Sequence, residues 1–161
     1  MKMVLASNNA HKLDELQALF GDLGVSLVTQ GSLAIPEAEE PHLTFVENAL
    51  AKARHASQLS GLPALADDSG LSVHALGGAP GVLSARYATL FGRAKSDDEN
   101  NAVLLERMAG QTDRRARFVS VLVAVRSADD PEPLIAMGRW EGEILAQRQG
   151  QGGFGYDPNR R

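Results

Sequence analysis

The chain has 161 residues, a formal net charge of −4, 43% hydrophobic and 22% charged residues, and no cysteine. This composition is typical of a globular protein, and residues 1–161 suit a single domain, with room for two small lobes. The lack of cysteine excludes disulfides, thiolate nucleophiles and zinc bound by sulfur. The acidic charge argues against a nucleic-acid partner but permits a small phosphate ligand. No apolar run suits a signal peptide or a membrane span of roughly 20 residues, so we expect a cytoplasmic protein with no membrane partner.

The first half of the chain alternates predicted strands and helices. Strands are predicted at 3–6 and 25–29, around an amphipathic helix at 11–20. Thr44 begins a capping box that opens a second helix, which ends at Gly61. The predicted apolar positions are Leu13, Leu16, Leu19 and Phe20 in the first helix, and Val46, Leu50, Ala53 and Leu59 in the second.

The second half combines short strands with one helix. A short strand at 64–66 ends at Asp67, and residues 71–76 form another candidate strand. A second capping box at 96–99 opens a helix that runs through Met108. The valine-rich segment 116–126 is the strongest strand, and 134–145 is expected to be its antiparallel neighbour. This order of elements predicts an α/β fold with a mixed sheet and flanking helices.

Residues 7–12 lie between the first strand and the first helix, and they are the first candidate site. The start of a helix offers unpaired backbone N–H groups and a positive dipole end, which suit a phosphate. Ser7 and Asn9 can donate hydrogen bonds, and Lys12 adds a full charge. Asn8 or Asn9 acting only as a helix cap is the simpler alternative. Lys12 has the wrong sign for the first turn of a helix, so an anion nearby would explain it.

Asp67 and Asp68 form the second candidate site, at the predicted end of a strand. The carboxyl ends of strands are where α/β proteins place ligands. If the strand geometry continues, only one of the two carboxylates faces the ligand, and the other caps a turn or meets a basic partner. A carboxylate here suits Mg²⁺, which takes oxygen ligands and usually only one or two from protein. On the residue pattern alone, an ordinary Asp-Ser-Gly turn is the favoured alternative.

Two further segments carry candidate chemistry. The acidic run at 37–40 is usually a solvated loop. Glycines around Phe154 in the segment 152–158 leave its ring open to a flat base, and Asp157 could accept N–H groups from that base. A glycine-rich turn with Phe154 in the core is the alternative. The four histidines have no metal-ligand spacing.

Six motifs, read in order, span nearly the whole chain. They are Ser-x-Asn-x-x-Lys at 7–12, Thr-Phe-x-Glu-Asn-Ala at 44–49, Ala-Asp-Asp-Ser-Gly-Leu at 66–71, Leu-Gly-Gly-Ala-Pro-Gly at 76–81, Ser-Ala-Arg-Tyr at 84–87 and Gly-Gly-Phe-Gly-Tyr-Asp-Pro at 152–158. Together they resemble the inosine/xanthosine triphosphate pyrophosphatase family, also called the Ham1-like family.

The resemblance implies an elongated mixed α/β fold, with two lobes around a central cleft, that usually forms homodimers. It implies Mg²⁺-dependent hydrolysis of non-canonical purine nucleoside triphosphates (ITP, dITP, XTP) to the monophosphate and pyrophosphate. Two alternatives are a nucleotide-binding remnant with little turnover and a Maf-like pyrophosphatase acting on modified pyrimidine nucleotides.

The resemblance also assigns roles to particular residues. Asp68 matches the magnesium ligand and proton acceptor, and Glu40 matches a second metal-associated acid. Lys12 matches a catalytic and substrate-binding lysine. The remaining substrate contacts carried over by motif are Ser7, Asn8, Asn9, Ala10, His11, Ser69, Phe154, Gly155, Tyr156 and Asp157.

Two segments depart from the family pattern. The family usually has a glycine between the second acid and the helix cap, whereas this chain has Pro41-His42-Leu43. Members also continue past the Gly-Tyr-Asp-Pro motif with a lysine and a Ser-His-Arg motif that grip the base. We therefore expect this 161-residue form to keep the metal and triphosphate apparatus but to discriminate bases poorly.

Overall fold

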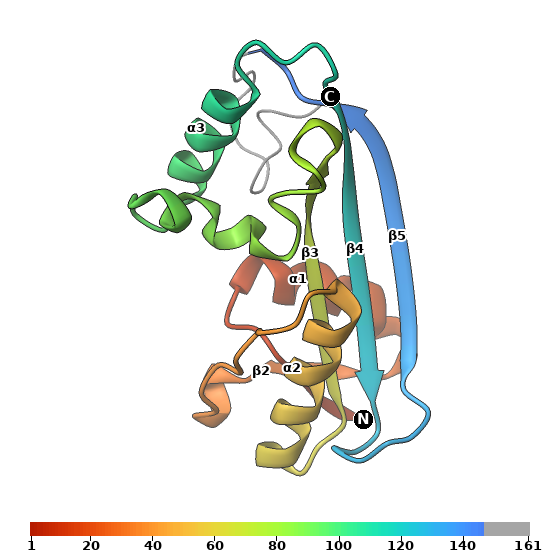
Figure 1. Ribbon diagram of the computed structural model, residues 1–161. Coiled ribbons are helices and arrows are strands. Elements are labelled where there is room, and N and C mark those ends of the chain that lie inside the picture. Colours follow the sequence, from red (N-terminus) through yellow and green to blue (C-terminus); the bar gives the residue numbers. More distant parts are fainter. Residues whose placement is uncertain (147–161) are drawn as a thin grey trace. The chain divides into compact units, whose positions relative to one another are not determined.

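The computed structural model describes residues 1–146 and places their five strands in one sheet (Figure 1). The strand order is β2-β1-β3-β4-β5, and β1 pairs in parallel with both β2 and β3. The chain divides into two compact units. Within the described residues, unit 1 is Met1–Asp68 with Val121–Met137, and unit 2 is Ser69–Ser120 with residues 138–146. The predicted α/β class with a mixed sheet is confirmed.

Unit 1 contains the parallel strands and two of the α-helices. β1 (Lys2–Leu5) leads into α1 (Ala10–Phe20), a 3-10 turn η1 (Gly21–Leu23) and β2 (Ser26–Thr29). A second 3-10 turn, η2 (Gly31–Leu33), and an extended segment then lead to α2 (Phe45–Ser60). α2 begins at the predicted cap Thr44, and α1 begins at Ala10, one residue before its predicted start, with Asn9 as its N-cap.

The two α-helices of unit 1 cover opposite faces of its strands (Figure 1). On the α1 face, Met3 and Leu5 of β1 and Leu65 of β3 pack with Leu16 and Leu27. α2 contacts β1, whose other face carries the fully buried Val4. Because strand side chains alternate between faces, residues 64–68 of β3, which belong to unit 1, also alternate between α1 and α2.

The predicted apolar faces of these helices hold only in part. In α1, Leu16 is buried but Leu19 is 66% exposed, because it lies a quarter turn from the face shared by Leu13, Leu16 and Phe20. In α2, Leu59 is exposed, and the buried positions are Asn48, Ala49, Ala53, Ala56 and Ser57. Small residues at these positions let the helix lie close to the sheet.

β3 (Ala64–Val73) is one continuous strand, so the predicted break at Asp67 is wrong. The local turn preference of Asp-Ser-Gly is outweighed by pairing of β3 with its neighbouring strands, and the strand continues into unit 2. There the buried hydroxyl of Ser84 accepts a hydrogen bond from the Leu71 N–H at 2.9 Å. The segment predicted as a separate strand at 71–76 is therefore the end of β3, followed by the 3-10 turn η3 (His74–Leu76).

Unit 2 builds its core around α3 (Asp97–Met108), which begins at the predicted cap Ser96. The long 3-10 segment η4 (Gly81–Phe91) precedes it and carries the Ser-Ala-Arg-Tyr motif. Asn100 of α3 ties the two together, since its side chain bonds the backbone of Ala88 and Ala85. The core residues are Leu71, Val73, Leu104, Met108, Ala116 and Ile144, with Tyr87, Ala88 and Val103 beside them.

The last two strands are β4 (Arg115–Val125) and β5 (Leu134–Glu143), close to the predicted ranges. In unit 1, the end of β4 and the start of β5 form a hairpin (Figure 1). Its turn is fixed by Asp130, which is buried and accepts hydrogen bonds from the side chain and the backbone N–H of Arg126. None of the helices within residues 1–146 has the length and apolar character to cross a membrane.

Candidate functional site

The predicted phosphate segment lies at the carboxyl end of β1, where the strand stops at Leu5. The neighbouring strands flank this end, because the Ala6 N–H donates to Leu65 O and the Gln30 N–H donates to Leu5 O, both at 2.9 Å. The carboxyl edge of parallel strands is the usual place for a ligand in α/β proteins. Residues 7–9 leave the sheet at this edge and enter α1.

Three polar side chains hold the shape of this segment. Ser7 Oγ accepts the Asn9 N–H at 3.1 Å, and Asn9 Oδ1 caps α1 by accepting the Lys12 N–H at 3.1 Å. Asn8 Oδ1 accepts the Gly31 N–H at 2.8 Å. The capping alternative for Asn9 is thus confirmed. It does not remove a binding role, because each bond uses an oxygen as acceptor and the hydroxyl or amide hydrogens can still donate to a phosphate.

Ala10 and His11 form the first turn of α1. The leading N–H groups of a helix have no partner within the helix and point toward its N-terminal end, as an anion site requires. The His11 side chain is exposed, and its Nε2 lies 4.0 Å from Glu15 Oε2. Any contribution of these two residues to phosphate binding is therefore expected from their backbone.

Lys12 meets Asp67, whose Oδ2 lies 2.9 Å from Lys12 Nζ. Both side chains are largely buried, with 19% and 14% exposed. Asp67 is therefore the anion that explains a lysine in the first turn of α1. The prediction that one of the two adjacent aspartates meets a basic partner is confirmed, and the alternative of an Asp-Ser-Gly turn is wrong.

Asp68 has a different cation on the opposite face of β3. Lys52 of α2 lies with its Nζ 3.9 Å from Asp68 Oδ1 and 3.0 Å from Glu40 Oε1. The pleat explains this division, because Leu65 and Asp67 share the α1 face while Asp68 points to the α2 face. Two carboxylates, Glu40 and Asp68, thus converge on the ammonium group of Lys52. Asp68 is the next residue in the chain after Asp67, which pairs with Lys12 on the other face of β3.

The convergence of Glu40 and Asp68 also fits the predicted magnesium ligands. Mg²⁺ prefers oxygen donors and commonly takes one or two carboxylates, with the remaining positions filled by water and phosphate. Within residues 1–146 there is no group of three or more potential metal-binding side chains, so a dedicated cage of protein ligands is absent from this part of the chain. The donor set therefore fits an ion shared with a phosphate ligand.

Five predicted substrate contacts remain, of which the structure describes only Ser69. Ser69 follows Asp68 in β3 and is half-buried, as the first residue of unit 2. Phe154, Gly155, Tyr156 and Asp157 lie outside the described residues.

Lys52 belongs to this cluster but was not predicted from the sequence as a site residue. Its signal was present in α2, since Lys52 sits between the buried alanines Ala49 and Ala53 and two turns beyond the cap. A lysine beside a buried helix face needs a carboxylate partner nearby. The local sequence around Lys52 does not identify that carboxylate partner, because Glu40 and Asp68 come from separate segments of the chain.

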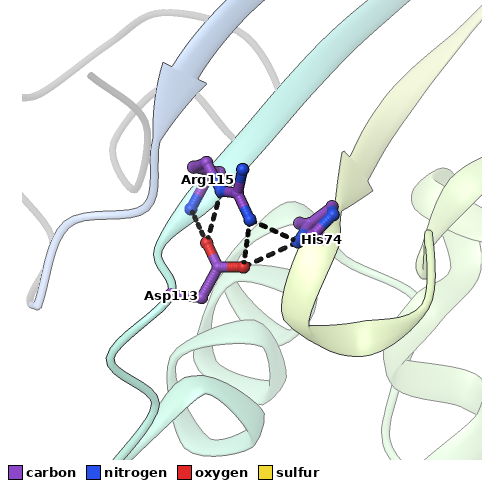
Figure 2. A network of polar contacts seen from close by, with 3 residues as sticks. All are labelled: His74, Asp113 and Arg115. Atoms are coloured by element: carbon purple, nitrogen blue, oxygen red, sulfur yellow. Dashed lines mark hydrogen bonds and ion pairs between the residues drawn. The ribbon is translucent and has the colours of Figure 1, made fainter.

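Unit 2 holds a charged network of another kind (Figure 2). Arg115 donates from Nε to Asp113 Oδ1 and from Nη2 to Asp113 Oδ2, both at 2.9 Å. His74 Nδ1 lies 2.6 Å from the same Oδ2. The Arg115 hydrogen bonds, with that of His74, hold the pKa of Asp113 well below its ordinary value. The guanidinium of Arg115 and the carboxylate of Asp113 thus form an exposed bidentate pair with two parallel hydrogen bonds.

The fold and the cluster in unit 1 define an α/β protein with lysine–carboxylate pairs at the carboxyl edge of its parallel strands. The chain belongs to the Ham1 family, whose profile matches residues 3–159.

The comparisons with individual proteins agree with this membership. A dITP/XTP pyrophosphatase of Methylibium petroleiphilum is 66% identical, covering 98% of this chain and 80% of that protein. The corresponding protein of Ralstonia nicotianae is 65% identical, with 98% and 79% covered. Among solved structures, a HAM1 protein from Coxiella burnetii is 48% identical with a TM-score of 0.91, covering 99% of this chain and 81% of that one.

Proposed function

We propose that this protein hydrolyses non-canonical purine nucleoside triphosphates (ITP, dITP and XTP) to the monophosphate and pyrophosphate. The observation that carries the proposal is the convergence of Glu40 and Asp68 on Lys52. The residue before Asp68 in the chain, Asp67, forms a second lysine–carboxylate pair with Lys12. The relatives described above, which are named dITP/XTP pyrophosphatases, support the reaction and the substrate class.

The phosphates are assigned to the carboxyl end of β1. The donors are the side chains of Ser7, Asn8 and Asn9 and the first backbone N–H groups of α1. Lys12 and Lys52 supply positive charge from the two faces of β3. Both ammonium groups are paired with carboxylates, so phosphate oxygens replace or share those partners when the substrate binds.

Asp68 is the proposed proton acceptor. It orients the attacking water and takes its proton as the bond between the α- and β-phosphates is cleaved. Glu40 and Asp68 would hold Mg²⁺, which when bound neutralises charge on the phosphates. The remaining rate enhancement comes from positioning and electrostatics, as is general for phosphoryl chemistry.

Several finer features accompany the proposal. Phe154 and Asp157 would contact the base, with Gly155 and Tyr156 between them, and Ser69 would contact the substrate beside Asp68. The two-lobed arrangement around a central cleft, the homodimer and the cytoplasmic location are proposed on the family resemblance. Light scattering from the purified chain tests the homodimer.

The direct test is to incubate the purified chain with Mg²⁺ and ITP, dITP, XTP or ATP, and to separate the products by chromatography. We expect the monophosphate and pyrophosphate in equal amounts from the inosine and xanthosine nucleotides, and no turnover when the metal is chelated. Release of single phosphates would contradict the proposal. Binding without turnover would indicate a remnant, and preference for modified pyrimidines would indicate a Maf-like enzyme.

A further inference from the structure

Asn48 has a buried side chain whose two polar atoms both bind the backbone of one residue. It lies in the first turns of α2 and is 1% exposed. Its Oδ1 accepts the His42 N–H at 3.0 Å, and its Nδ2 donates to His42 O at 3.2 Å. The amide therefore pairs with His42 as a neighbouring strand would, and a buried amide of this kind needs both partners.

These bonds are not required to start the helix. Thr44 is the N-cap of α2 and accepts the Glu47 N–H at 3.1 Å. The Thr44 hydroxyl also donates to Glu47 Oε1 at 2.8 Å. Since the cap is complete without Asn48, its side chain serves the segment that precedes the helix.

That segment carries Glu40, two residues before His42. Residues 36–43 form no helix or strand, so their position depends on contacts with other elements. Pro41, between the two, limits the backbone freedom that links them. One helical turn after Asn48, Lys52 binds Glu40 Oε1 at 3.0 Å. The same side of α2 thus holds the segment at three points. Asn48 binds the backbone of His42, Lys52 binds the carboxylate of Glu40, and His55 Nε2 lies 2.8 Å from Pro36 O.

We infer that Asn48 is a positioning residue that places Glu40 beside Lys52 and Asp68. The inference rests on the proposed role of Glu40 near the metal and phosphates. The two hydrogen bonds between Asn48 and His42 set the path of the segment, so the Glu40 carboxylate reaches Lys52.

The test measures binding of an inosine triphosphate analogue with a methylene group between its α- and β-phosphates, by calorimetry with Mg²⁺. Asn48→Leu removes both hydrogen bonds while keeping the number and branching of the side-chain heavy atoms, and Asn48→Ala replaces it if the leucine variant does not fold. We expect about a tenfold loss of affinity, the scale seen when a residue supporting a metal ligand is removed. Ser57→Ala is the matched control, because Ser57 is also buried in α2 and donates to Leu62 O at 2.7 Å.

Two further measurements separate positioning from general stability. The His42 amide should exchange with solvent faster in Asn48→Leu than in wild type or Ser57→Ala. In a Glu40→Gln background, Asn48→Leu should change affinity less than about twofold, since residues that act through one another are not additive.

Unchanged affinity in Asn48→Leu, or a full tenfold loss in the Glu40→Gln background, would overturn the inference. An equal loss in Ser57→Ala would do the same. If Glu40→Gln alone leaves binding intact, the proposed role of Glu40 is wrong and the inference falls with it. A loss in Glu40→Gln without one in Asn48→Leu overturns only the positioning role.

Discussion

In unit 1 the side chains of Lys12 and Lys52 are each 19% exposed, whereas that of Arg115 in unit 2 is 68% exposed. Arg115 grips Asp113 with two parallel hydrogen bonds, and the carboxylate is satisfied by this fork and by His74. The lysines instead meet their carboxylates as single point charges.

This difference in burial and in the type of cation separates the network around Asp113 from the proposed binding site. An exposed pair in high dielectric is screened by solvent and contributes little, however good its geometry. Partly buried charges interact more strongly, and a flexible ammonium can change partner when a more highly charged anion arrives. Carboxylates held by lysine at the carboxyl end of β1 are thus suited to ligand binding, and those held by arginine to structure.

The largest effect is expected from Asp68→Asn, which removes the proposed proton acceptor and metal ligand. Pyrophosphate release from ITP at saturating Mg²⁺ should fall by about a hundredfold or more, the scale of an acid–base or metal-ligand defect. Asp113→Asn is the matched control in unit 2 and should leave the rate unchanged. Equal losses in both variants would remove the distinction between the two regions.

A smaller effect is expected from Gly31→Ala. An added Cβ at Gly31 would lie 2.5 Å from Asn8 Oδ1, so Asn8 must move and lose its bond to the Gly31 N–H. Asn8 is then no longer held for its proposed contact with phosphate, and the loss of one hydrogen bond to the ligand, about 1 kcal/mol, corresponds to about a fivefold weaker affinity for the methylene analogue. Gly21→Ala is the control, because its Cβ makes only an ordinary 3.4 Å contact with Gln17. Unchanged affinity in Gly31→Ala would show that the path of residues 7–9 is unimportant for binding.

The smallest effect on activity is expected at Asp130, a carboxylate held by arginine within unit 1. Hydrogen bonds from the Arg126 side chain, and from the backbone of Arg126 and Glu132, hold the pKa of Asp130 well below its ordinary value of 3.8. Because the folded-state pKa is the lower one, ionised Asp130 stabilises the fold above about pH 4, and this contribution is lost as the pH falls through the folded-state pKa. Asp130→Asn should therefore lower the Tm at pH 7, by an amount that shrinks on acidification below pH 4.

The pyrophosphate release rate of Asp130→Asn at a temperature well below its Tm should equal that of wild type. A Tm difference that stays constant or grows on acidification would contradict the assignment of the carboxylate as ionised and stabilising.

Local patterns in the sequence were enough to predict most of the fold. The capping residues Asn9, Thr44 and Ser96 start the three α-helices of residues 1–146, and hydrophobic periodicity located every strand of this range except β3 to within a few residues. The break predicted at Asp67 failed because the turn preference of Asp-Ser-Gly is local, whereas the continuity of β3 is set by its neighbours.

The candidate site was predictable only in part, for a related reason. Residues 7–12 and Asp68 stood out through helix-end chemistry and adjacent charges. The ion-pair partners could not be predicted, because they lie far apart in the sequence and come together only in the folded chain. These pairs are Lys12 with Asp67 and Lys52 with Glu40. The buried amide of Asn48 looked like any residue of a helix start, and only its two bonds to His42 distinguish it.

The most direct test of the central claim compares how two cations contribute to polyphosphate binding. Calorimetry with the methylene analogue and Mg²⁺ should show a loss of about ten- to a hundredfold in Lys12→Met, which corresponds to a hydrogen bond to a charged group. Arg115→Met should bind as wild type does. Equal affinity in wild type and Lys12→Met would contradict the assignment of the carboxyl end of β1 as the triphosphate site.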